Sequence, residues 1–288
     1  MAVYNGASTI ERALDSVFSQ TYQDFDVLVL DDGSTDQSGE VARRYDCRVI
    51  TVPNGGLGAA RKLMVEEATG EYIAFIDSDD FWLPEKLEKQ VAVLDKTQAS
   101  IVHADCWFMH DNGRIVPRDL DIPDNSDAFS HVLPNNSIIA SSAVFRRSDM
   151  LEVGNFVADT VRCSDWYGWL MLAPGHKFVH MKEKLVEYSV LESSLANAGF
   201  RFYQAQHHLL TTHVLPKREE LFAGLPSNRR ARYVRMLVRD VGLALSGMAR
   251  AKRATGLTQE SRQLAVDALR HAPDSTKVWG RALSCLRP

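Results

Sequence analysis

Two acidic clusters are the residues of this sequence best suited to chemistry. They are Asp77-Ser78-Asp79-Asp80 and Asp31-Asp32. Carboxylates two residues apart on an extended segment point to the same side, so Asp77 and Asp79 can converge on one cation, while Asp80 points the other way and is expected to be structural. Hard divalent ions such as Mg²⁺ or Mn²⁺ take oxygen ligands and usually keep several waters, which leaves room for phosphate oxygens. The pattern therefore predicts a divalent metal site that also receives a phosphate-bearing ligand.

Acidic clusters of this kind also occur in other settings. Acidic residues often end strands in turns and helix caps, and Asp36 is placed to cap the helix that follows it. A haloacid-dehalogenase-like phosphatase also has Asp-x-Asp after a strand, but it needs Thr or Val two residues beyond the second Asp, where Phe81 stands here. Two acidic clusters at strand ends of one sheet favour a functional site over structural turns or caps, and the residue at position 81 argues against the phosphatase.

The first hundred residues alternate between short apolar runs and amphipathic stretches. Runs rich in Val, Ile and Leu predict strands at residues 25–30, 47–52, 72–76 and 100–103. Helices are predicted at about residues 8–18, 36–45 and 58–68 and from Pro84 onward. This alternation predicts an α/β domain built on a mainly parallel sheet flanked by helices. Ligands bind beyond the carboxyl ends of such strands, where both acidic clusters lie.

From about Gly199 the pattern predicts helices only, at residues 229–253, 259–271 and 275–286. Residues 1–198 hold 17 Lys and Arg against 31 Asp and Glu, while residues 199–288 hold 16 against 6. An acidic body needs a cation to bind an anionic nucleotide. The basic helical appendage suits an anionic partner or surface, and a solvated helix face docked on the acidic body explains it equally well.

Composition excludes several classes of protein. With 45% apolar and 24% charged residues the chain is globular, and no apolar run reaches the roughly 18 residues of a membrane-spanning helix. The N-terminus lacks the features of a signal peptide. The four cysteines form no Cys-x-x-Cys pair and fit neither a zinc site nor a disulfide framework. We expect a cytoplasmic protein without a nucleic-acid partner.

Seven segments carry a resemblance to a known family. In chain order they are Val3-Tyr4-Asn5-Gly6, residues 14–22, Asp31-Asp32-Gly33-Ser34-Thr35-Asp36, residues 54–61, residues 70–80, Val153-Gly154-Asn155-Phe156 and residues 164–170. Residues 2 to about 195 resemble a family 2 glycosyltransferase of the GT-A fold. Each segment alone is weak, but their shared order and spacing are specific.

The resemblance implies a role for each matching position. It implies that the nucleotide-sugar donor is contacted by Tyr4, Asp31, Asp32, Arg61 and Asp77. Tyr4 would pack on the base, Asp32 would hydrogen-bond it, and Arg61 would approach the phosphates. Asp79 would bind the metal, with Asp77 contacting the metal or the ribose. Asp165 would be the catalytic base.

The chemistry of sugar transfer agrees with these roles. A bound divalent ion stabilises the charge of the departing diphosphate, and the attacking hydroxyl must lose a proton to a carboxylate. Asp165 suits that task, although Ser164-Asp165 is also a reasonable helix N-cap. Trp166 beside it could stack on an acceptor sugar, with core packing as the alternative.

Three positions depart from the family pattern. Only Met1-Ala2-Val3 precede Tyr4, so we expect that the natural start lies upstream. Ser164 stands where many relatives have Glu before the catalytic Asp. Leu191 stands where relatives often carry a His, which leaves a phosphate or metal contact from that loop without its usual residue.

We therefore predict an inverting, metal-assisted glycosyltransferase of the hexosyltransferase type. It would move a sugar from a nucleoside diphosphate donor, which we expect to be UDP-linked, to a saccharide or lipid-linked acceptor. The glycosyltransferase domain would span residues 1–198, with the nucleotide-sugar half at 1–104 and the acceptor half at 105–198. Residues 199–288 would form the basic helical region, suited to peripheral association at the inner face of a membrane.

Two alternatives stay open. A nucleotide-sugar-binding module of the same fold would bind the donor without turnover. A sugar-phosphate nucleotidyltransferase would want a basic, Gly-rich signature near the N-terminus, and Gly55-Gly56-Leu57-Gly58 comes later with only Arg61 and Lys62 nearby.

Overall fold

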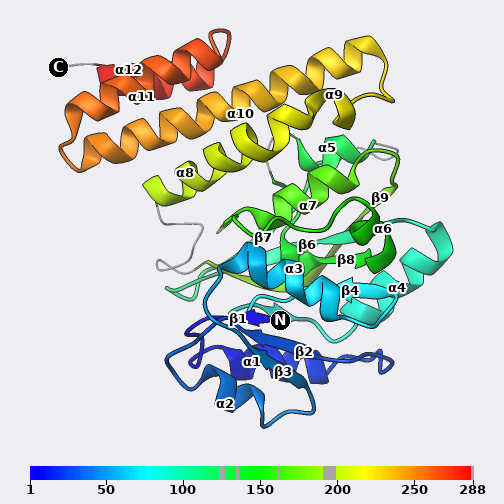
Figure 1. Cartoon of the computed structure of the whole chain (residues 1–288). Coiled ribbons are helices and arrows are strands. Elements are labelled where there is room, and N and C mark those ends of the chain that lie inside the picture. The colour runs from blue at the N-terminus through cyan, green and yellow to red at the C-terminus, as the bar shows by residue number, and fades with distance from the viewer. Residues whose placement is uncertain (123–126, 134–135, 161, 191–198, 287–288) are drawn as a thin grey trace. The chain divides into compact units, whose positions relative to one another are not determined.

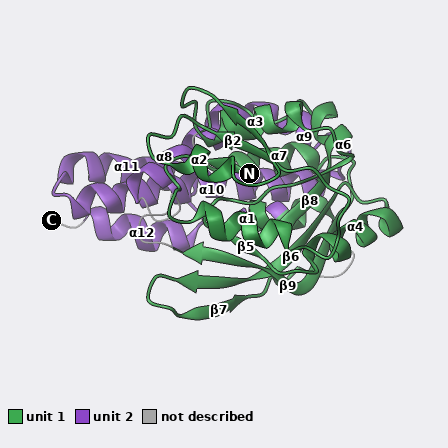
Figure 2. Cartoon of the chain, turned by 90° about the horizontal axis from the view of Figure 1, so that it is seen from below, with its two compact units in different colours: residues 1–131, 137–191 green, residues 132–136, 192–288 purple. Residues whose placement is uncertain are grey.

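A computed structural model describes residues 1–122, 127–133, 136–160, 162–190 and 199–286 (Figure 1). The chain forms two compact units (Figure 2). Unit 1 consists of residues 1–131 and 137–191, and unit 2 of residues 132–136 and 192–288. Residues 191–198 lie outside the described residues. They include the predicted domain boundary at residue 198 and Leu191.

Unit 1 begins with a three-stranded parallel sheet. Its strands, in the order β1-β2-β3, are β1 (Ala2–Val3), β2 (Leu28–Asp31) and β3 (Arg48–Thr51). Helices α1 (Ile10–Phe18) and α2 (Ser38–Ala42) connect them. The apolar face predicted for α1 is buried through Ile10, Leu14 and Val17, whereas Phe18 is 37% exposed and stacks on Tyr45.

A second sheet of unit 1 has the strand order β4-β8-β6-β9-β5, with β7 paired to β6. Its strands are β4 (Tyr72–Ala74), β5 (Phe81–Trp82), β6 (Ile101–His110), β7 (Ile115–Arg118), β8 (Ala143–Arg146) and β9 (Phe178–Val190). Here β6 and β9 run parallel and the other pairs are antiparallel.

The α/β class with a C-terminal helical region is confirmed, but the parallel pairing predicted for the sheet holds mainly for the first three strands. Antiparallel pairs need no crossover helix. A short turn between His110 and Ile115 is enough to return the chain from β6 to β7. The sequence pattern of buried strands does not distinguish the two kinds of pairing.

The remaining helices of unit 1 are α3 (Leu57–Glu67), α4 (Lys86–Thr97), α5 (Ala128–Val132), α6 (Arg147–Glu152) and α7 (Ser164–Leu172). A parallel bridge pairs Ala2 of β1 with Asp77, which follows β4 of the second sheet. This bridge brings the end of β1 beside the acidic run, so both predicted acidic clusters lie at the same junction.

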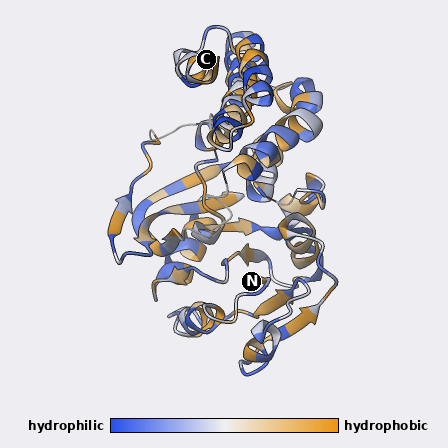
Figure 3. Cartoon of the chain, turned by 90° about the vertical axis from the view of Figure 1, so that its left-hand side faces the viewer, coloured by the Kyte–Doolittle hydropathy of each residue, from blue (hydrophilic) through white to orange (hydrophobic). Residues whose placement is uncertain are grey.

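Unit 2 is helical, as predicted. Its helices are α8 (Phe200–His208), a π-helical turn (Leu209–Val214), α9 (Arg218–Leu221), α10 (Ser227–Ala254), α11 (Thr258–His271) and α12 (Thr276–Leu286). Hydrophobic and hydrophilic residues alternate in bands along these helices (Figure 3). A Cβ on Gly247 would lie 2.5 Å from the Tyr203 ring, so only glycine permits the close contact of α8 with α10.

No helix of the described chain combines the length and apolar content that crossing a bilayer requires. Association of the basic helices with a membrane surface, and a cytoplasmic location, stay predictions.

Asp240 is an acidic residue buried in the middle of α10. Its side chain is 0% exposed, and neither carboxylate oxygen has a hydrogen-bond partner in the described residues, with Arg239 3.6 Å away. Burial raises the pKa of Asp240 to about 7, and Arg239 opposes the rise only in part.

The raised pKa predicts a pH-dependent gain from Asp240→Asn. Between pH 4 and 7 the unfolded chain loses this proton while the folded chain keeps it, so stability falls as pH rises and the penalty is complete above pH 7. The free energy of unfolding of the variant should therefore be roughly 2–4 kcal/mol higher than that of the wild type at pH 8 and equal to it near pH 4. Urea unfolding at both pH values measures this, with exposed Asp274→Asn as the control. An equal gain at pH 4 and pH 8 would contradict the explanation.

Candidate active site

The acidic run Asp77-Ser78-Asp79-Asp80 forms a tight turn. The Asp80 amide donates to the Asp77 carbonyl oxygen at 3.1 Å, and β4 has already ended at Ala74. The extended geometry predicted for this segment is therefore wrong. The turn, and not strand alternation, brings the carboxylates of Asp77 and Asp79 into each other's field.

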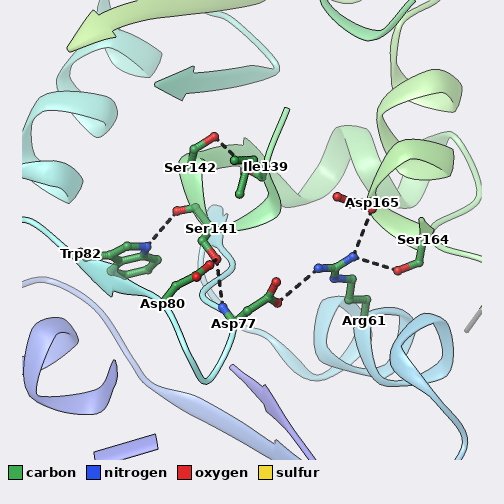
Figure 4. A network of polar contacts seen from close by, with 9 residues as sticks. All are labelled: Arg61, Asp77, Asp80, Trp82, Ile139, Ser141, Ser142, Ser164 and Asp165. Atoms are coloured by element: carbon green, nitrogen blue, oxygen red, sulfur yellow. Dashed lines mark hydrogen bonds and ion pairs between the residues drawn. The ribbon is translucent and has the colours of Figure 1, made fainter. Parts of the chain in front are cut away.

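Asp80 anchors this turn to the sheet. Its side chain is 0% exposed and accepts hydrogen bonds from Ser141 Oγ at 2.5 Å and from the Ser189 amide at 2.9 Å. Ser141 Oγ also accepts the Asp77 amide at 3.0 Å, so one serine holds both ends of the run (Figure 4). Burial, followed by Asp77 and Asp79, raises the pKa of Asp80 well above its usual value. These contacts make Asp80 a structural residue.

Arg61, on α3, joins the acidic run to the start of α7 (Figure 4). Its side chain is 3% exposed, and its guanidinium lies 3.3 Å from Asp77 Oδ1 and 3.5 Å from Asp165 Oδ1. It also donates a 2.9 Å hydrogen bond to Ser164 Oγ. This geometry gives Arg61 a positioning role, and its direct contact with the nucleotide stays a prediction.

Two glycines allow α3 to place Arg61 there. Gly56 has φ +83°, a left-handed conformation that glycine adopts without strain, and it directly precedes the helix. A Cβ on Gly58 would lie 2.5 Å from the carbonyl oxygens of Val157 and Thr160. The absent side chain lets the segment before α7 approach α3, which brings Ser164 and Asp165 within reach of Arg61.

Asp79 is the carboxylate that remains available for a ligand. Burial and then the nearby Asp77 raise its pKa to about 6. Within the described residues no cation lies within 4 Å of it, while its carbonyl oxygen accepts a hydrogen bond from Ser189 Oγ. A divalent cation beside Asp79 and Asp77 would offset both their repulsion and the burial of charge, and carboxylate oxygens are the ligands such an ion takes. The donor set fits the predicted metal.

Asp165 lies in the first turn of α7, with its side chain 15% exposed. The N-cap position belongs to Cys163, so the alternative that Asp165 caps this helix is wrong. Arg61 instead fixes the orientation of the carboxylate. The Asp165 carboxylate is thus partly exposed and paired with a buried guanidinium.

The loops after β2 and β3 are held together by their own polar groups. Asp31 Oδ1 accepts the Ser34 amide at 2.9 Å, and Asp32 accepts the amides of Gly55 and Gly56 at 2.8 and 2.9 Å. Both carboxylates are 5% exposed and stabilise the loops. Contact of either with the donor stays a prediction. Tyr4, in contrast, is 54% exposed, as a surface for stacking must be.

The structure contradicts the assignment of Trp166 to the acceptor. Its side chain is only 1% exposed, so its ring offers no open face to a sugar. Tyr167 and Trp169 are buried as well. All three belong to the core, because α7 is buried on nearly every side. The nine residues of α7 have no polar face, so their sequence does not show which side chains are exposed.

Three serines of the site were not found from the sequence. Ser141 and Ser189 hold the acidic run, and Ser164 accepts from Arg61. Isolated serines give no spacing signal. Only Ser164 stands out in the sequence, as the replacement for a more common Glu.

The acidic turn therefore lies beside the carboxyl edge of the parallel sheet and next to a second, mixed sheet. The model of Glycosyl transferase family 2 matches residues 1–153, and the chain belongs to this family. The chain is 27% identical over 220 residues to the Escherichia coli UDP-Glc:alpha-D-GlcNAc-diphosphoundecaprenol beta-1,3-glucosyltransferase WfgD, and the alignment covers 73% of this chain and 83% of that protein.

Solved structures share the fold. S. aureus TarS 1–349 in complex with UDP-GlcNAc superposes with a TM-score of 0.63 at 17% identity, over 99% of this chain and 87% of that one. Mannosyltransferase PcManGT from Pyrobaculum calidifontis, in complex with GDP-Man and Mn²⁺, gives 0.57 at 19% identity, over 99% and 83%.

The contacts of Arg61 predict that Arg61→Met destabilises the protein strongly. Removing one partner leaves Asp77 and Asp165 close together and partly buried without a compensating charge, which should cost about 3 kcal/mol. Denaturant unfolding measures the loss. Arg48→Met, which removes an exposed ion pair to Glu67, is the matched control and should cost less than about 1 kcal/mol. Adding Asp165→Asn to Arg61→Met should restore part of the stability. Equal losses for the two single variants would rule out this role for Arg61.

Proposed function

We propose that this protein transfers a sugar from a nucleoside diphosphate donor, UDP-linked, to a saccharide or lipid-linked hydroxyl, with inversion at the sugar. The observation that supports it best is the arrangement of three carboxylates: Asp77 and Asp165 both contact Arg61, and Asp79 lies in the field of Asp77. Two are suited to a metal and the third to a base. WfgD, by its name, uses UDP-Glc and a diphosphoundecaprenol-linked acceptor, and TarS was solved with UDP-GlcNAc.

The donor would bind across the junction of the two sheets. Tyr4, exposed after β1, would pack on the base. Asp77 and Asp79 would hold a Mg²⁺ or Mn²⁺ ion, and such an ion acts as a Lewis acid toward diphosphate oxygens. PcManGT, in whose structure Mn²⁺ accompanies GDP-Man, supports a metal of this kind.

Asp165 would take the proton of the acceptor hydroxyl. As that oxygen bonds to the anomeric carbon, the bond from this carbon to the diphosphate oxygen breaks and the diphosphate leaves with the electron pair. The proton passes to the Asp165 carboxylate. One displacement with a single base inverts the anomeric centre. Arg61 would keep the Asp165 carboxylate oriented. Correct orientation of the base increases the rate of proton transfer in a general-base step.

A metal site at Asp79 predicts that Mn²⁺ stabilises the wild-type protein and not Asp79→Asn. A ligand that binds only the folded state raises the melting temperature, by an amount equivalent to about 2.7 kcal/mol at a hundredfold excess over Kd. A thermal melt over a Mn²⁺ series with UDP present measures this. Asp46→Asn, an exposed carboxylate outside the site, should respond as wild type does. A full response in Asp79→Asn would refute the assignment.

A base at Asp165 predicts that Asp165→Asn loses transfer and keeps donor binding. Asparagine preserves the shape but cannot accept the proton, so kcat should fall about 10²–10⁴-fold while the Kd for UDP changes little. Release of UDP from a panel of UDP-sugars, with calorimetry for binding, separates the two. Glu152→Gln, exposed on α6, should keep wild-type activity. Equal, slow UDP release by wild type and Asp165→Asn would favour the binding module without turnover.

A further inference from the structure

The acidic run is wrapped around Ser141, a residue far from it in sequence. Ser141 lies in the 3₁₀ turn Ala140–Ser142, which directly precedes β8, and it is 0% exposed. Its hydroxyl accepts the Asp77 amide at 3.0 Å and donates to Asp80 Oδ2 at 2.5 Å. Its carbonyl oxygen accepts a hydrogen bond from Trp82 Nε1 at 2.8 Å (Figure 4). The acidic run and the strand that follows it therefore bond to one serine at three points.

The turn that carries Ser141 is itself fixed from other elements. Gln90, which is 0% exposed on α4, donates from Nε2 to the Ser142 carbonyl oxygen at 2.8 Å. Trp82 is 3% exposed, and its amide donates to Ser16 Oγ on α1 at 3.1 Å. Protein interiors are close-packed, so groups held in this way move little. The core of unit 1 thus sets the position of the Ser141 hydroxyl.

The two groups that meet at this hydroxyl need opposite partners. A backbone amide only donates, whereas the facing carboxylate oxygen of Asp80 accepts. A hydroxyl serves both at one atom, and alanine serves neither. Because Asp77 and Asp80 are the two ends of the run, these bonds fix how sharply the chain turns between them. The turn in turn places the Asp77 and Asp79 carboxylates, and a small divalent ion tolerates little variation in the placement of its ligands.

We propose that Ser141 is a positioning residue for the metal, whose hydroxyl holds Asp77 and Asp79 in the arrangement that one divalent cation requires. Ser141 touches neither the ion nor the substrate and acts through the turn. Groups that orient metal ligands in this way typically contribute about 10–100-fold to metal affinity. The inference rests on the proposed function and adds to it a residue outside the acidic run that sets the affinity for the metal.

Ser141→Ala tests the inference, with Ser142→Ala as the matched control. Ser142 lies in the same turn and is 1% exposed, but its hydroxyl donates to the Ile139 carbonyl oxygen at 2.8 Å. Calorimetry of Mn²⁺ binding with UDP present measures metal affinity, and thermal melts without metal measure stability. We expect both variants to melt at a lower temperature, and the Kd for Mn²⁺ to rise about tenfold in Ser141→Ala only.

The dependence of transfer on Mn²⁺ gives a second readout. Because Ser141 acts on metal affinity, the Mn²⁺ concentration that gives half-maximal transfer should rise about tenfold in Ser141→Ala. The kcat at saturating Mn²⁺ should stay within about threefold of the wild-type value. A loss of stability alone would leave the Mn²⁺ dependence of the folded enzyme unchanged.

Trp82→Phe tests the same contact if Ser141→Ala does not fold. It removes the indole N–H that bonds the Ser141 carbonyl oxygen and keeps an aromatic ring in the core. The hydroxyl of Ser141 remains, so we expect a smaller rise in the Kd for Mn²⁺, of about threefold. An unchanged Kd in this variant would then overturn the inference.

The remaining outcomes separate the inference from the proposed function. An unchanged Kd for Mn²⁺ in Ser141→Ala would overturn the inference alone, since the hydroxyl would then matter only to the fold. An equal rise in Ser142→Ala would also overturn it, because any disturbance of the turn would then be sufficient. Failure of the wild-type protein to bind Mn²⁺ in the presence of UDP would overturn the proposed function and the inference with it.

Discussion

The buried guanidinium of Arg61 is the interaction on which the site depends. Residues from three distant parts of the chain, Asp77, Ser164 and Asp165 with Arg61 itself, meet at one side chain that is 3% exposed. Burying a charge is costly unless it is paired and hydrogen-bonded. The buried guanidinium therefore requires both carboxylates beside it, and it holds them in place. The fold itself thereby sets the placement of Asp77 relative to Asp165.

The acidic run divides its carboxylates between structure and chemistry. Asp80 is turned inward and satisfied by Ser141 and Ser189, whereas Asp79 is left near Asp77 without a cation of its own among the described residues. The buried residue stabilises a turn that holds the other two in a geometry they would otherwise avoid. The repulsion between Asp77 and Asp79 is what the divalent ion of the proposed function would offset.

Close backbone approach is the second condition of the site. Gly58 on α3 lies against carbonyl oxygens of the segment just before α7. Gly56 directly precedes α3, and its amide donates a hydrogen bond to Asp32. These glycines and Asp32 belong to segments that resemble the family, and the structure shows why side chains there would disturb it. The glycines at the start of α3 therefore help to place Arg61.

The sequence by itself determined the family, the strands near the acidic clusters, the helices of the first hundred residues and the last three helices, because periodicity, caps and motif spacing are local properties of the chain. Only the tertiary structure decided what each residue does in three dimensions. It turned the acidic run into a tight turn, buried Trp166, engaged Arg61 with two carboxylates and made most pairs of the second sheet antiparallel. Burial and pairing depend on which distant segments meet, and two of those partners, Ser141 and Ser189, are isolated serines that carry no pattern of their own.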